Sequence, residues 1–165
     1  MKKFLLTLLL VMFCNVSFAE IIKQNNTFDN SHSVISFFAS KSSELGADSP
    51  LEISLKKETF SNNSNYTVFI KTDNPQKSFV VTIEDSKLKF SNNKIIKVQT
   101  QSDNAMESEK IAFRLTQEIL NELINTNTLA IQMPLFTRDK TQVKYVVYNI
   151  PKLVIDEWKQ VIEMN

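Results

Sequence analysis

Residues 51–56 read Leu51-Glu52-Ile53-Ser54-Leu55-Lys56, with apolar side chains at the odd positions and polar ones at the even positions. Because successive side chains of a β-strand point to opposite faces of a sheet, this alternation predicts a strand with one buried face and one face in water. Comparable alternation predicts strands along most of the chain. The predicted strands cover residues 34–39, 51–56, 66–71, 78–84, 87–90, 94–100, 110–115, 128–136 and 142–150.

Clusters of Asn, Ser and Asp separate these runs at intervals of roughly 8–12 residues, a spacing typical of an antiparallel meander, sandwich or barrel. Such residues tolerate left-handed backbone or hydrogen-bond to their own turn. The chain has one glycine, Gly46, so asparagine must supply most turn positions that need a positive φ. The turn clusters lie at 61–65, 73–75, 91–93 and 101–104.

Two helices are expected in the C-terminal half of the chain. Thr116 is placed as the N-cap of the first, which has an acidic first turn and ends at residues 125–127. Pro151 suits the first position of the second helix. The apolar residues that recur at helical spacing are Ile119, Leu120, Leu123 and Ile124 in the first helix, and Leu153, Val154, Trp158, Val161 and Ile162 in the second.

These patterns predict a mainly β fold, between all-β and α+β. We expect an antiparallel sandwich or curled sheet of about eight or nine strands with two short helices. A lipocalin-like closed barrel is the alternative, although the first helix would interrupt its meander. The length of 165 residues suits one domain, which we place at residues 33–165 after a flexible, mostly polar leader at 20–32.

The first nineteen residues predict a secretory signal peptide. Lys2 and Lys3 precede an apolar run that extends to Phe13. Small residues at the two positions that a signal peptidase reads, Ser17 and Ala19, predict cleavage between Ala19 and Glu20. A retained N-terminal anchor and lipoprotein processing at Cys14 are the alternatives. The run is shorter than the ~20 apolar residues that a membrane-spanning helix needs, so we expect no stable span after cleavage. The predicted location is the periplasm or the outside of a bacterial cell.

Charge and cysteine content exclude several classes of function. Of 19 basic residues, Lys2 and Lys3 lie in the signal, which leaves 17 against 18 acidic residues and a net charge of −1. A near-neutral chain without a basic run is not expected to bind nucleic acid or an anionic membrane. Removal of Cys14 with the signal would leave no thiol or disulfide chemistry. We expect no cofactor.

Few residues could support catalysis, and we predict no catalytic or metal-ligating residue. His32 is the only histidine, so a His-pair metal motif is excluded, and as a general base for Ser31 or Ser33 it would lack a third orienting group. A single glycine cannot form a phosphate loop or a nucleophile elbow. A carboxylate-dependent hydrolase is the enzymatic alternative, and its only candidate acids are Glu84, Asp85, Asp103, Glu107 and Glu109.

Aromatic residues are the remaining candidates for a functional surface. Phe37 and Phe38 are adjacent in a predicted strand, so they must face opposite sides of the sheet. Tyr148 lies in a strand that is apolar on both faces, and Trp158 either closes the core or anchors an interface. These four residues are the predicted interaction contacts.

Together these features predict an exported, non-enzymatic interaction or binding protein of the bacterial envelope that works through sheet edges, faces or loops. Another envelope or extracellular protein is the expected partner. The second alternative is a carrier of a small apolar ligand, which would need an apolar cavity of at least ~300 Å³ between the sheets.

Overall fold

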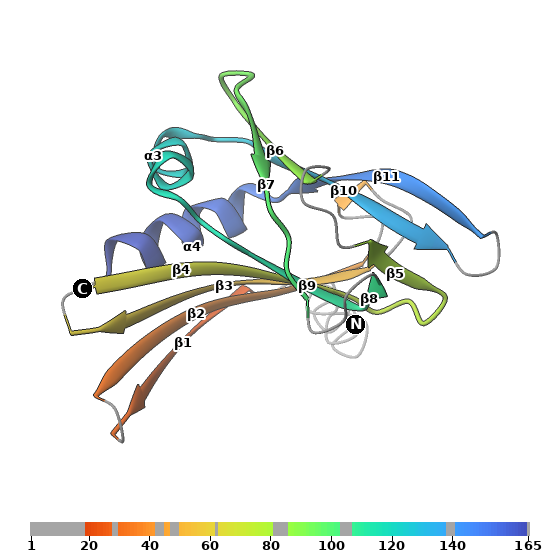
Figure 1. Ribbon diagram of the computed structural model, residues 1–165. Helices are drawn as coiled ribbons and strands as arrows, with labels where there is room; N and C mark the ends of the chain where they lie inside the picture. The colour runs from red at the N-terminus through yellow and green to blue at the C-terminus, as the bar shows by residue number, and fades with distance from the viewer. Residues whose placement is uncertain are drawn as a thin grey trace, which may run out of the picture.

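The computed structural model describes residues 19–27, 30–41, 45–46, 50–61, 63–80, 86–102, 107–137 and 141–164. Within them the chain is mainly β, with two sheets of antiparallel strands and two helices in the C-terminal half, as the sequence predicts (Figure 1). The predicted signal peptide up to Phe18 and Cys14 lie outside the described residues, as do Glu84, Asp85 and Asp103.

In the described part of the chain, sheet A has five strands in the order β1-β2-β3-β4-β9. Their bounds are Ala19–Asn26, Ser31–Ser40, Leu51–Phe60, Asn63–Thr72 and Lys110–Arg114. Sheet B has six strands among the described residues, ordered β7-β6-β10-β5-β8, with β11 added on β10. Their bounds are β7 Ile95–Val98, β6 Ser86–Phe90, β10 Leu129–Thr137, β5 Lys77–Val80, β8 Glu107–Ser108 and β11 Gln142–Ile150.

The strand β1 is the main difference from the expected secondary structure. Residues 20–32 were expected to form a leader, but Ala19–Asn26 pairs antiparallel with β2 along its whole length. Ile21 packs against the core while Ile22 is exposed on the other face. Two apolar residues are too few to show a period of two in the sequence, and the main-chain hydrogen bonds to β2 define the strand instead.

The alternation of β3 sets the two faces of sheet A. Leu51, Ile53 and Leu55 are buried on the inner face, while Ser54 and its polar neighbours lie on the outer face. The inner faces of both sheets and the two helices form one buried apolar cluster, which includes Leu45 from the segment between β2 and β3.

Helix α3 (Gln117–Asn125) begins after the predicted cap, since the side chain of Thr116 accepts a hydrogen bond from the Ile119 N–H. Helix α4 (Lys152–Glu163) begins one residue after Pro151, which itself occupies the N-cap position. Most of the predicted apolar stripes are buried. Exposed members are Ile124 and Leu153, and Ile155 is buried in α4 although it was not predicted.

Helix α4 covers part of the inner face of sheet A, packing on β1, β2 and β3 with α3 beside it (Figure 1). Its far end is held by Lys57, whose ammonium group donates to the carbonyl oxygens of Ile162 and Met164. The Tyr66 hydroxyl also donates to Ile162, at 3.4 Å. In the middle of α4, a carboxylate oxygen of Glu157 accepts a 2.9 Å hydrogen bond from the hydroxyl of buried Ser36.

Candidate binding surface

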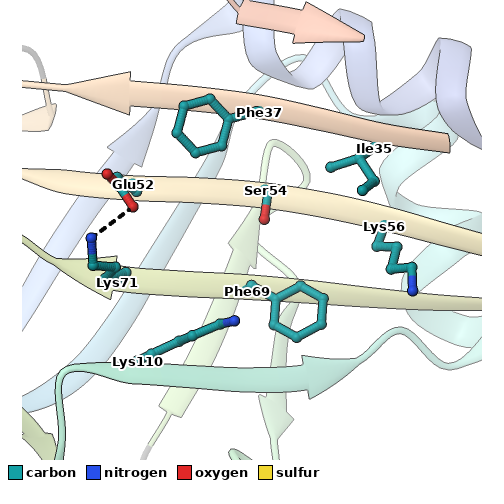
Figure 2. Close-up of a pocket in the computed structure, with 8 residues that line it drawn as sticks. All are labelled: Ile35, Phe37, Glu52, Ser54, Lys56, Phe69, Lys71 and Lys110. Atoms are coloured by element: carbon teal, nitrogen blue, oxygen red, sulfur yellow. Dashed lines mark hydrogen bonds and ion pairs between the residues drawn. The ribbon is translucent and has the colours of Figure 1, made fainter. Parts of the chain in front are cut away.

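A shallow depression of about 290 Å³ lies on the outer face of sheet A, opposite the core (Figure 2). Four neighbouring strands contribute to it, because alternate residues of each point away from α4. Its lining residues are Ile35 and Phe37 from β2, Glu52, Ser54 and Lys56 from β3, Phe69 and Lys71 from β4, and Lys110 from β9.

The hollow exists because a small residue lies between two large ones. Ser54 is the register partner of Phe37 on one side and of Phe69 on the other. Neighbouring strands are about 4.8 Å apart, so the two rings stand on the strands flanking Ser54 with only a hydroxymethyl group between them. Figure 2 shows the rings on either side of Ser54. Both phenylalanines are half-buried, so part of each ring remains accessible.

Ion pairs hold two of the three lysines at the rim. Lys71 lies 3.1 Å from a carboxylate oxygen of Glu52 and 3.5 Å from one of Asp73. The hydrogen bond to Glu52, helped by the charge of that carboxylate, raises the pKa of Lys71. Lys56 pairs with Glu58 at 2.8 Å.

Lys110 differs from the other two lysines. Its ammonium nitrogen lies 4.8 Å from the centre of the Phe69 ring, a cation–π geometry. It forms no ion pair with any carboxylate in the described part of the chain, and the Ser54 hydroxyl likewise has no hydrogen-bond partner there. The depression therefore combines two apolar walls, an available hydroxyl and a cation that is not neutralised.

This set of groups suits binding better than acid–base catalysis. Glu52 is the only carboxylate among the described residues of the lining, and Lys71 already pairs with it. Among the described residues, no group of three His, Cys, Asp or Glu side chains could hold a metal ion.

A second candidate surface is the outer edge of sheet B. Strand β11 pairs with β10 over its full length, and no described strand pairs with its other edge (Figure 1). On its outer face Val143, Tyr145 and Val147 expose 52%, 55% and 42% of their surface. An edge strand with a row of apolar side chains can bind a strand of another chain.

Of the four predicted interaction residues, only Phe37 reaches a surface, and it lines the depression. Phe38, Tyr148 and Trp158 expose 2% or less and belong to the core. Phe38 and Tyr148 face inward from strands whose adjacent positions face outward, and Trp158 lies in the buried stripe of α4. They cannot contact a partner in this conformation.

The candidate catalytic residues are not brought together in the described residues. His32 is exposed at the start of β2, where its Nδ1 lies 3.0 Å from the side-chain oxygen of Asn25. Glu109 is exposed, and the side chain of Glu107 is not described. The carrier alternative requires a cavity between the sheets, so this outer depression is a different site.

Sequence reasoning missed Ser54, Phe69 and Lys110 as members of a site. The alternation in β3 does place Ser54 on the wet face, but only the register shows that Phe37 and Phe69 flank it.

Comparisons with protein-family models, curated proteins and solved structures gave no match to this chain. No helix in the described residues has the length and apolar character needed to cross a bilayer.

Proposed function

We propose that this chain is an exported, non-enzymatic protein of the bacterial envelope that binds another envelope protein at the β11 edge of sheet B. The partner contributes an extended segment, which adds to the sheet beside β11. Export rests on residues 1–19, and cleavage after Ala19 would leave β1 intact from Glu20 onward.

The open edge of β11 is the observation that carries this proposal. In an antiparallel ladder, alternate residues direct their N–H and C=O groups to opposite edges of the strand. Half of the main-chain groups of β11 therefore face the side on which no described strand lies. Strand addition draws its affinity from such groups and its selectivity from the side chains beside them.

The side chains on this part of sheet B indicate the chemistry of the partner. The four strands β6, β7, β10 and β11 contain Lys87, Lys89, Lys97 and Lys144 and no acidic residue. A complementary segment has apolar side chains at alternate positions, to cover Val143 and Val147, and carries acidic residues. A second copy of this chain fits less well, because it would bring Lys144 against a strand that also lacks acids.

Site-specific photocrosslinking in the producing cells tests the proposal. We expect a photoreactive phenylalanine analogue at position 147 to give one dominant, stoichiometric product, identified by mass spectrometry. The matched control is position 60, where Phe60 is 55% exposed on sheet A. The purified partner should then slow hydrogen exchange of the β11 amides. V143K, on the same face of β11 as position 147, should abolish both readouts while F60K does not.

Equal crosslinking at positions 147 and 60, or a partner that leaves β11 exchange unchanged, would overturn the proposed edge. A product consisting of two copies of this chain would replace the heterologous partner with self-association.

A further inference from the structure

The depression on sheet A carries an inference that does not depend on β11, since it lies on the other sheet. We propose that it is a binding site for a small organic acid with one apolar ring, of the aryl carboxylate class. The ring lies over Ser54 between Phe37 and Phe69, and the carboxylate points toward Lys110.

The apolar part of this ligand follows from the walls. The faces of Phe37 and Phe69 and the side chain of Ile35 offer apolar contact, and aromatic groups favour offset or edge-to-face packing with a ring. A volume of about 290 Å³ is at the lower end of the range for small-molecule sites, so it fits a single ring with a short side chain.

The charge distribution fixes the orientation of the ligand. In the row of register partners that crosses the depression, Glu20 of β1 lies beyond Phe37 and Ala112 of β9 lies beyond Phe69. The cations of β9, Lys110 and Arg114, lie two residues to either side of Ala112 on the same face. Lys71 and Lys56 are already paired with carboxylates, whereas Lys110 and Arg114 of β9 pair with none in the described residues. A carboxylate is therefore attracted to the β9 side and repelled from the β1 side.

Lys110 is already positioned for such a contact. Its ammonium group lies over the ring of Phe69, which is itself a wall of the depression. A carboxylate at the edge of the bound ring can replace water on that ammonium group without removing a partner carboxylate. The small Ser54 side chain, between the two phenylalanines, leaves room on the floor for the ring.

Titration of the purified protein with 3-phenylpropionate, followed by amide chemical shifts, tests this site. We expect saturable shifts in residues 52–56, 69–71 and 110–114. The neutral amide, 3-phenylpropionamide, should bind about fivefold more weakly or worse, as for the loss of a partly exposed ion pair. Propionate, which keeps the carboxylate and lacks the ring, should not saturate.

Three variants and a matched control locate the interaction. K110Q should weaken binding about fivefold, K110R should restore most of it, and S54L should abolish it by filling the space between the rings. K23Q makes the same charge change at an exposed lysine on the inner side of β1 and should bind as the parent protein does. Unchanged amide shifts away from each substitution show that the fold is retained.

The site is overturned by an absence of saturable shifts, by shifts that map elsewhere, by equal affinity for the acid and its amide, or by K110Q binding no differently from K23Q.

Discussion

Lys57 continues the alternation of β3 but places an ammonium group on the buried face. It exposes 7% of its surface, and its charge is satisfied by the last carbonyl groups of α4 and by the ring of Tyr66, 5.5 Å away. The negative end of a helix dipole favours a cation at this position. This one residue therefore links the strand that sets the faces of sheet A to the helix that covers it.

We expect K57M to lower the free energy of unfolding by about 1–3 kcal/mol, because the apolar stem is kept while the charged hydrogen bonds are lost. Urea unfolding followed by circular dichroism measures the change. K56M is the control: Lys56 directly precedes Lys57, lies on the outer face and, within the described residues, forms an ion pair only with Glu58. Equal losses for the two variants would show that burial of Lys57 has no energetic role.

At the scale of the element, β1 can be tested by two neighbouring residues. Ile21 packs against the core, and Ile22 faces water on the outer side. We expect I21E to cost about 1–3 kcal/mol of stability, as for a charge placed against apolar surface, while I22E stays within about 0.5 kcal/mol. Chemical denaturation compares them. Similar, small effects would mean that these residues do behave as a leader.

The β6–β7 hairpin is tied to α3 by a charge cluster that makes stability depend on pH. Lys94 lies 2.8 Å from Glu118 and 2.9 Å from Glu122, and Asn92 donates a hydrogen bond to Glu122. The hydrogen bonds to Glu118 and Glu122 raise the pKa of Lys94, and the bonds from Lys94 and Asn92 lower the pKa of Glu122.

We expect K94Q to melt a few degrees below the parent at pH 7. The gap should close in acid, because a lowered carboxylate pKa stabilises the fold above about pH 4.3 and that contribution is lost as pH falls through the folded-state value. Because the pKa of Lys94 is raised, the difference in melting temperature should persist up to about pH 10.4. It should be lost as the pH rises through the folded-state pKa of Lys94. Melting curves from pH 3 to 11 measure this. A gap independent of pH would contradict the electrostatic origin, and K152Q, at the surface pair with Asp156, is the control.

At the scale of the whole molecule, Trp158 is the only tryptophan and lies where α4 packs on sheet A. Because the two sheets and both helices share one apolar cluster, we expect a single cooperative transition. Tryptophan fluorescence should therefore report the same urea midpoint as far-ultraviolet circular dichroism, which follows both sheets. Two separate midpoints would show that the sheets unfold independently.

The sequence predicted the strands and helices well because alternation and helical spacing are local signals. Gln142–Ile150 matches its predicted bounds, and most other strands agree within a few residues. Pairing was not predictable, since no local signal shows that β10 pairs with both β5 and β6. Nor could alternation decide which of Phe37 and Phe38 faces the core, because the two side chains are equally apolar.

The depression depends on that missing information. Phe37, Ser54 and Phe69 are far apart in the chain and become neighbours only in the observed register, and a shift of one residue would turn Ser54 into the core. The loss of Phe38, Tyr148 and Trp158 as surface candidates has the same cause. An aromatic residue in a strand is typical both of a core and of a binding surface. The sequence cannot distinguish the two until it is known which face of the strand is buried.

Strand β10 meets two successive neighbours along one edge, β6 opposite Leu129–Gln132 and β5 opposite Leu135–Thr137. Met133 and Pro134 fall between these two blocks, and proline has no N–H to donate. The seam divides that side of sheet B into two segments, each of which can detach while β10 stays bound to β11. We therefore expect the native state to open locally in two separate places. The pairing of β10 with the β5–β8 pair can be lost transiently while the β6–β7 hairpin, and helix α3 bound to it, stay in place.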